Sequence, residues 1–154
     1  MVGLPEAAVR EARERVKGAI QASRFAFPKG KITVNLAPAD LPKEGGRFDL
    51  GIALGILART GALPAPRLAR FEVIGELGLY GELRPVRGAL SAAIAAGKAG
   101  RGILVPLQNR QEVALATGVD ARAVAHLDEA CALLNSPDSD IGRATQNGPH
   151  ALPV

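Results

Sequence analysis

The chain has 154 residues, a formal net charge of +4 and 47% hydrophobic residues, which is ordinary for one globular domain with a core of its own. Aromatic residues make up 3%, which excludes an aromatic-rich platform for stacking nucleic-acid bases. The sequence pI of about 9.7 permits contact with DNA or anionic surfaces, and it equally fits a solubilising surface bias.

The first part of the chain predicts a helix, a strand and a second helix. Between residues 5 and 21, apolar side chains recur at the three- and four-residue spacing of an amphipathic helix. Residues 31–36 alternate between apolar and polar side chains, which is typical of a strand. A second helix is expected to start after Asp49 as its N-cap and to end before Gly61 and Pro64. Its core face would carry Ile52, Ile56 and Leu57.

The second half predicts short strands that alternate with helices. Residues 71–84 indicate a strand, a tight turn at Tyr80-Gly81 and a return strand. The Ala-rich stretch 89–99 favours a helix, and the apolar run 102–105 favours a strand buried on both faces. Three further elements are expected: a helix over 111–117 capped by Gly118, a strand over 123–127 and a helix over 128–134.

This alternation predicts an α/β (α+β) sandwich with helices packed on a mixed sheet. We expect one domain over residues 1–135, followed by a disordered polar tail over 136–154. The only cysteine, Cys131, lies in an apolar helical stretch and is expected to pack in the core. Because an intrachain disulfide is impossible and no apolar run reaches membrane-spanning length, we expect a cytoplasmic protein without a membrane partner.

Several short motifs stand in a fixed order along the chain. They are VGLP at 2–5, ITVNLAPAD at 32–40, KEG at 43–45, FDL at 48–50, GEL at 75–77 and GELRPVRG at 81–88. Over residues 2–134 the series resembles the N-terminal domain of the magnesium-chelatase-like AAA+ ATPases of the ComM/YifB type. Any one of these motifs alone would be weak, whereas the ordered set is specific.

The resemblance implies a fold and a context. The fold is that of the Lon protease catalytic domain, or ribosomal protein S5 domain 2-like, which the C-terminal domain of RadA-type recombination proteins shares. Members of the family continue into a P-loop module, so ATP and Mg²⁺ are expected there and no cofactor is expected in this domain. The resemblance also implies a hexameric homo-oligomer in the full-length protein, and some members move branched DNA in natural transformation.

The Lon resemblance raises the question of peptidase chemistry, which needs a serine nucleophile and a lysine with a lowered pKa. In the matching segment, Arg47 occupies the position of the serine. Counting from Gly75 without gaps, Leu90 occupies the position of the lysine. Neither a guanidinium nor an isobutyl group can perform acyl transfer, so we expect no catalytic residues and no enzyme activity in this domain.

Nucleotide and metal binding are also not expected. The stretch 97–100 (GKAG) lacks the spacing of a phosphate loop, and Ala99 cannot ligate Mg²⁺, so it is interpreted as the end of a helix and a turn. The two histidines, His126 and His150, do not stand with Cys131 or carboxylates at metal-ligand spacing.

Arginines at three positions remain as candidate contacts for nucleic acid or a protein partner: Arg47, Arg84 and Arg87. By the fold resemblance they surround the degenerate protease cleft, where guanidinium groups would bind DNA phosphates or a partner's carboxylates. The alternative is that they pair with Glu44, Glu76 and Glu82, which are close in sequence. The first helix offers a second basic strip, interpreted as a solvated face because glutamates interleave it (Arg10, Arg13 and Lys17).

Three hypotheses for function follow. The first is a non-catalytic accessory domain of an AAA+ ATPase that supports ring assembly, DNA contact or both. The second is a stand-alone adaptor that docks a protein partner through the degenerate cleft. The third, a relict Ser-Lys peptidase, is opposed by the residues at both dyad positions.

Overall fold

A computed structural model describes residues 6–23, 25 and 46–136. The helices are α1 (Glu6–Ala22), α2 (Asp49–Arg59), α3 (Ala65–Leu68), α4 (Ala89–Lys98), α5 (Arg110–Val113) and α6 (Leu127–Leu134), with a 3-10 turn η2 (Leu107–Asn109). The strands are β1 (Phe71–Val73), β2 (Glu76–Leu77), β3 (Leu83–Arg84), β4 (Gly102–Pro106) and β5 (Ala121–Val124). The expected strand at 31–36 and residues 137–154 of the expected tail lie outside the described residues.

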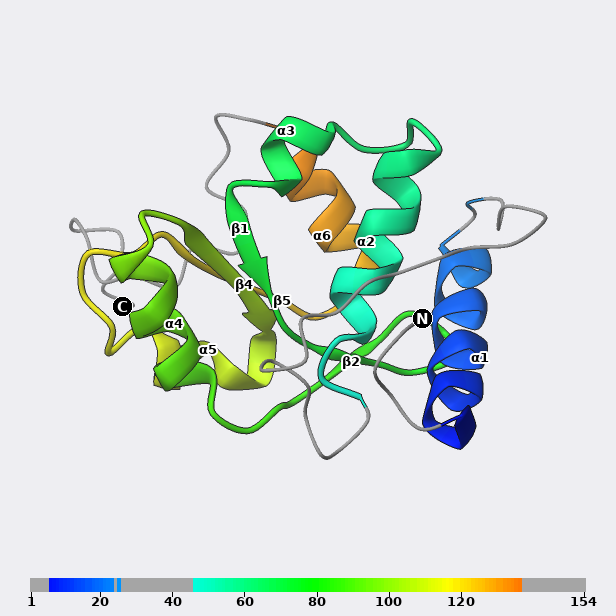
Figure 1. Ribbon diagram of the computed structural model, residues 1–154, viewed down its shortest axis with the longest axis horizontal. Helices are drawn as coiled ribbons and strands as arrows, with labels where there is room; N and C mark the ends of the chain where they lie inside the picture. The colour runs from blue at the N-terminus through cyan, green and yellow to red at the C-terminus, as the bar shows by residue number, and fades with distance from the viewer. Residues whose placement is uncertain (1–5, 24, 26–45, 137–154) are drawn as a thin grey trace.

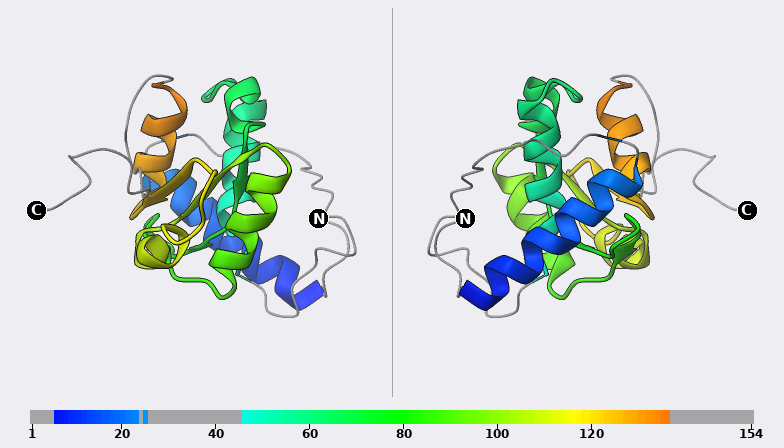
Figure 2. Two further views of the ribbon diagram at one scale, coloured as in Figure 1. Left: turned by 90° about the vertical axis from the view of Figure 1, so that its left-hand side faces the viewer. Right: turned by 90° about the vertical axis from the view of Figure 1, so that its right-hand side faces the viewer.

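A three-stranded parallel sheet, in the order β1-β4-β5, forms the middle layer. Helices cover both faces: α2 and α6 lie on one side, while α4 and α5 lie on the other (Figures 1 and 2). The chain is therefore α/β, as the alternation of elements predicts. Within the described ranges, no helix is long and apolar enough to cross a membrane.

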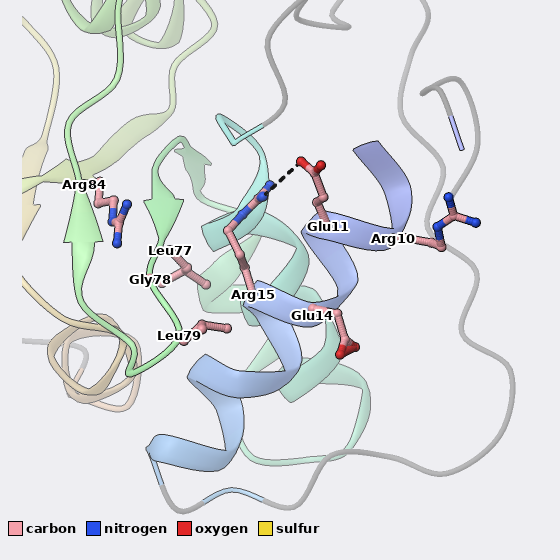
Figure 3. A pocket seen from close by; sticks show the side chains of 8 residues that line it. All are labelled: Arg10, Glu11, Glu14, Arg15, Leu77, Gly78, Leu79 and Arg84. Carbon is pink, nitrogen blue, oxygen red and sulfur yellow. Dashed lines mark ion pairs between the residues drawn. The ribbon is translucent and has the colours of Figure 1, made fainter. Parts of the chain in front are cut away.

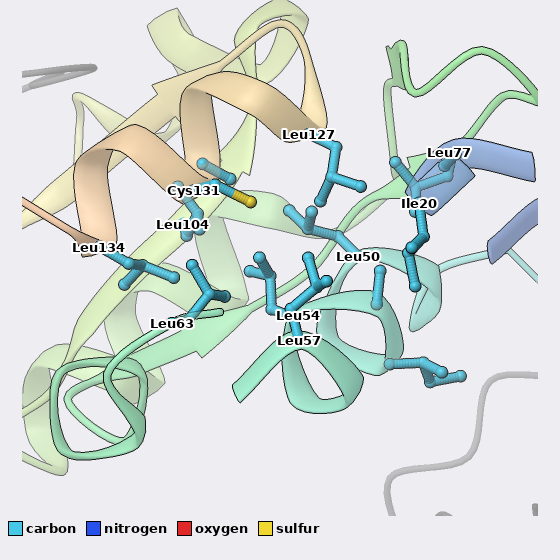
Figure 4. Close-up of a cluster of buried hydrophobic side chains, with 14 of the residues drawn as sticks. Ile20, Leu50, Leu54, Leu57, Leu63, Leu77, Leu104, Leu127, Cys131 and Leu134 are labelled. Atoms are coloured by element: carbon cyan, nitrogen blue, oxygen red, sulfur yellow. The ribbon is translucent and has the colours of Figure 1, made fainter. Parts of the chain in front are cut away.

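Strand β4 is buried on both faces, which confirms the interpretation of its apolar run. Leu104 packs into the larger core, which α1, α2 and α6 close (Figure 4). Its neighbours Ile103 and Val105 point into the second core, under α4 and α5. Alternate side chains of one strand thus belong to different cores. Cys131 is buried in the larger core, as expected, and this burial raises the pKa of its thiol to about 12.

The predicted strand-turn-strand over 71–84 is correct at the turn but wrong in its first strand. Residues Phe71–Val73 join the parallel sheet, and only the short strands β2 and β3 form an antiparallel pair. The break falls at Gly75, whose N–H donates to the Arg47 carbonyl and whose carbonyl accepts from Leu50 N–H. Because these backbone groups bind the start of α2, they are not available for a continuous ladder.

Asp49 is not the N-cap of α2. Phe48 occupies that position without a side-chain hydrogen bond, and Asp49 is the first helical residue. Its carboxylate is fully buried and bound elsewhere, as described below. The predicted core face of this helix is confirmed, because Ile52, Ile56 and Leu57 are all buried.

Two boundaries near the C-terminal end also differ from expectation. The helix expected over 111–117 is the shorter α5, which follows η2. The strand expected over 123–127 is β5, and His126 instead caps α6 by accepting from the Asp128 N–H at 3.0 Å. The backbone of His126 does not continue β5 but forms an isolated antiparallel bridge with Glu82.

Candidate nucleic-acid interface

The structure brings two of the three predicted arginines into direct contact. Arg47, in the turn before α2, donates through Nη1 to the Arg87 carbonyl at 2.7 Å. This bond fixes the half-buried Arg47 side chain against the segment that leaves β3. Arg84 lies on β3 and is exposed, three residues before Arg87.

The alternative that these arginines are neutralised by nearby glutamates holds in part. Arg84 pairs with Glu82 at 3.8 Å, but both side chains are about half exposed, and such a pair stabilises little. Glu44 lies outside the described residues. No ion pair within the described ranges joins Arg47 or Arg87 to Glu76.

A fourth arginine, Arg110, lies in the same region and was missed by the sequence reasoning. The buried Asn109 side chain accepts from the Val86 N–H at 3.1 Å and donates to the Val86 carbonyl at 2.9 Å. These two bonds hold the first residue of α5 beside the segment that carries Arg87. We call Arg47, Arg87 and Arg110 the basic cluster; Arg84 precedes it on β3 and lines the groove between the hairpin and α1.

A signal for Arg110 is present in the sequence. No acidic residue stands between Glu82 and Glu112, while this stretch holds five basic residues: Arg84, Arg87, Lys98, Arg101 and Arg110. Arg87 and Arg110 are exposed, and neither forms an ion pair within the described part of the chain. The basic cluster, which lies beyond the carboxyl end of β4, therefore offers two guanidinium groups free for an anionic ligand.

A largely buried ion pair joins three elements near the hairpin. Arg15 on α1 donates to both carboxylate oxygens of Asp49, at 2.6 and 3.2 Å. The Leu77 N–H of β2 donates to the same carboxylate at 3.1 Å. One side chain thus joins α1, α2 and the hairpin that carries Arg84. Burial raises the pKa of Asp49, although the Arg15 guanidinium and the Leu77 amide act in the opposite direction.

The second basic strip, on α1, has mixed charge. Arg10, Arg13 and Lys17 are exposed, and the exposed Glu11 and Glu14 interleave them, as the sequence indicates. Glu11 also reaches Arg15 at 4.0 Å (Figure 3). The open groove between α1 and the hairpin is lined by charges of both signs, with Arg84 opposite the acids of α1, beside Leu77 and Leu79. This face is less suited to a polyanion than the basic cluster is.

Arg47 and Leu90, the two positions that the sequence analysis matched to a peptidase dyad, form hydrogen bonds within the fold. Arg47 binds the Arg87 carbonyl. Leu90 is half buried against the second core, and its N–H donates to the Glu112 carboxylate at 3.1 Å. Within the described residues, no group of three or more His, Cys, Asp or Glu gathers in a way that could hold a metal ion.

Comparison with known proteins gives consistent relatives. The family model of subunit ChlI of Mg-chelatase matches residues 1–109. The YifB protein of Escherichia coli K12 is 48% identical over 96% of this chain and 31% of its own length. The competence protein ComM of Haemophilus influenzae is 52% identical over 75% of this chain and 23% of its own length. The Mycobacterium tuberculosis protein Rv2897c is 38% identical over 94% of the chain.

The chain therefore spans 31% or less of the length of the YifB and ComM relatives. The part of the chain that the family model matches includes Arg84 and Arg87. The relatives that share about half of their residues with this chain align with most of it. On these grounds the chain belongs to the magnesium-chelatase-like family of ComM and YifB.

Proposed function

We propose that this chain is a non-catalytic accessory domain of a longer AAA+ ATPase and that it contacts DNA phosphates through the basic cluster. The observation that carries the proposal is the gathering of three arginines beyond β4, Arg47, Arg87 and Arg110, of which Arg87 and Arg110 have no carboxylate partner in the described ranges. Guanidinium groups bind phosphate oxygens through parallel hydrogen bonds and release counterions.

The family supports a role with DNA. One relative is named a competence protein, which fits DNA processing during natural transformation as the setting for the present domain. In this proposal the domain works in the cytoplasm and holds no cofactor. ATP and Mg²⁺ bind a P-loop module elsewhere in the longer protein.

We further propose that the α/β architecture is the Lon protease or S5 domain 2-like fold without its chemistry. Arg47 and Leu90 stand at the dyad positions and are engaged in the bonds described above, which supports a binding rather than a hydrolytic role. The peptidase hypothesis is therefore the weakest of the three.

A second candidate function is contact between subunits of a ring or with a protein partner. Two apolar side chains on the face opposite α2 are exposed, Ile94 at 45% and Leu115 at 72%. They line an open groove between α4 and the residues after α5. This apolar area favours protein contact at a place separate from the basic cluster.

The test is fluorescence anisotropy with labelled single-stranded, duplex and branched DNA over a salt series. We expect affinity to fall steeply with salt, and Arg87→Ala with Arg110→Ala to weaken binding to every DNA. The slope of log affinity against log salt should become shallower by about 0.7 to 0.9 for each phosphate that the variant no longer neutralises.

A matched control removes the same charge elsewhere. Arg59→Ala with Arg70→Ala changes two exposed arginines at the end of α2 and at the amino end of β1, away from the cluster. This control should bind DNA nearly as the parent chain does. An equal loss of DNA affinity in both double variants would mean that binding depends on net charge and not on the basic cluster. No binding at low salt would reject DNA contact and leave protein contact as the function.

A further inference from the structure

The turn between β2 and β3 is fixed at almost every backbone position. Gly78 N–H donates to the Glu82 carbonyl at 2.8 Å, and Gly81 N–H donates to the Gly78 carbonyl at 3.1 Å. The Tyr80 N–H donates to the Glu82 carboxylate at 3.1 Å. Gly81 has φ +91°, a left-handed conformation that glycine adopts without strain.

Neighbouring helices hold the turn on both sides. His126 Nδ1 accepts from Asp128, so the ring hydrogen stands on Nε2 and donates to the Tyr80 carbonyl at 2.8 Å. The Leu127 N–H donates to the Gly81 carbonyl at 2.9 Å. On the other side the Leu79 backbone lies against α1, where a Cβ on Gly18 would approach the Leu79 oxygen to 2.9 Å.

The ring of Tyr80 is left in water by this rigid backbone. Its exposed fraction is 77%, although both its N–H and its carbonyl are bound. It is also the only tyrosine of a chain without tryptophan. A large ring that contributes little to the core, on a backbone that is already ordered, loses little further entropy when a flat ligand stacks on it.

The ring lies at the start of the segment that leads to the basic cluster. From Tyr80 the chain runs through β3 to Arg84 and on to Arg87. At about 3.3 Å per residue, Tyr80 and Arg84 are at most roughly 13 Å apart. Glu82, the acid between them, is engaged with the Tyr80 N–H and with Arg84. The segment thus carries one exposed aromatic ring, followed in the chain by two exposed arginines, Arg84 and Arg87.

We propose that Tyr80 stacks on a base of single-stranded DNA whose phosphates lie along Arg84, Arg87 and Arg110. This inference rests on the proposed function and adds the form of DNA that the site takes. A base in a duplex keeps its faces covered by its neighbours, whereas a single strand exposes them to an aromatic side chain. The arginines that follow the ring in the chain favour a polyanion over an apolar protein segment.

The absence of tryptophan makes the test direct, because tyrosine fluorescence of this chain reports Tyr80 alone. Titration with an oligothymidylate should quench this fluorescence along the same curve as anisotropy of the labelled strand. A duplex of equal length should raise the anisotropy with little quenching.

Two substitutions separate the ring from its hydroxyl group. Tyr80→Ala should weaken single-strand binding by about 5- to 150-fold, the range that removal of one base–aromatic stack gives. Tyr80→Phe keeps the ring and should stay within about 2-fold of the parent chain. Circular dichroism melting should be unchanged in both, since the ring is exposed.

Each outcome has a distinct meaning. Salt-dependent binding without quenching, and with Tyr80→Ala equal to the parent chain, would overturn the stacking role and leave the basic cluster standing. A change of light-scattering mass in Tyr80→Ala, with DNA affinity intact, would assign the ring to protein contact. Failure of every DNA to bind would reject both the stacking role and the proposed function.

Discussion

Single residues hold this domain together at a few points where burial and charge meet. Asp49 is fully buried and binds Arg15 and the Leu77 amide, so its negative charge is tolerated only because three donors satisfy it. The sequence marks Asp49 as a helix cap, because Asp before an apolar run is the usual cap. Its true partner, Arg15, is 34 positions away, which no local pattern reveals.

Removal of Arg15 should be costly. Arg15→Ala leaves a buried carboxylate without its cation, so we expect the free energy of unfolding to fall by about 3 kcal/mol. This is the lower end of the range for breaking a buried ion pair, because the Arg15 side chain is 22% exposed. Glu11→Ala, which removes only the exposed partner of Arg15, should change it by less than about 0.5 kcal/mol. Urea unfolding measures the free energy of unfolding of both variants. An equal loss in the two would contradict the view that burial of Asp49 makes its pairing with Arg15 important.

The same variant should have a distinctive pH dependence. The folded pKa of Asp49 already lies above the usual 3.8, and removing Arg15 takes away a contribution that lowers it. A folded pKa above the unfolded one means that the native state binds more protons, so Asp49 opposes folding above its folded pKa. This opposition disappears as the pH falls towards about 4. The deficit of Arg15→Ala relative to the parent chain should therefore shrink between neutral pH and about pH 4.

At the scale of elements, apolar periodicity predicts the helices and strands that carry their own pattern, and it misses features that depend on tertiary contacts. The predicted α1, α2, α4 and β4 agree with the structure within a few residues, because each carries a full apolar stripe or run of its own. The split of β1 from β2 depends on Gly75 binding the start of α2, and the place of Arg110 depends on Asn109 binding Val86. Both are contacts across at least 23 residues, invisible to local patterns.

The hairpin turn offers a test at this scale. Gly81→Ala places a Cβ 2.6 Å from His126 Cε1 in addition to the strain of φ +91°. Gly61→Ala has a similar φ of +88° but meets nothing within 4 Å. We expect Gly61→Ala to lower the free energy of unfolding by about 1–2 kcal/mol from strain alone. Gly81→Ala should lower it by at least about 1 kcal/mol more.

A double variant identifies the cause. If the added destabilisation comes from the His126 ring, Gly81→Ala should cost less in a His126→Ala background than in the parent chain. Chemical denaturation of the four chains gives the coupling energy. A cost independent of residue 126 would show that the added destabilisation does not come from the His126 ring.

For the whole molecule, the sheet makes the two cores one structure. Leu104 belongs to the core under α2 and α6, and Ile103 belongs to the core under α4 and α5, yet they are neighbours on the central strand. Strand β4 cannot leave the sheet without exposing both cores. The fold should therefore unfold as one cooperative unit, as small single domains usually do.

Cys131 allows this cooperativity to be measured from one side. It is the only thiol of the chain and is 5% exposed, and with a pKa of about 12 it should resist alkylation at about pH 8 while the domain is folded. Ile103→Ala alters the opposite core and should lower the free energy of unfolding by about 2–5 kcal/mol. If the cores open together, this loss of stability should increase the rate of Cys131 alkylation in proportion to the unfolded population, at least about 30-fold for 2 kcal/mol.

A matched control lies in the larger core. Leu104→Ala changes a residue beside Cys131, and its labelling rate should follow its own loss of stability. A labelling rate unchanged by Ile103→Ala, while circular dichroism records the destabilisation, would mean that the core under α4 and α5 opens separately, and that the sheet divides the domain instead of uniting it.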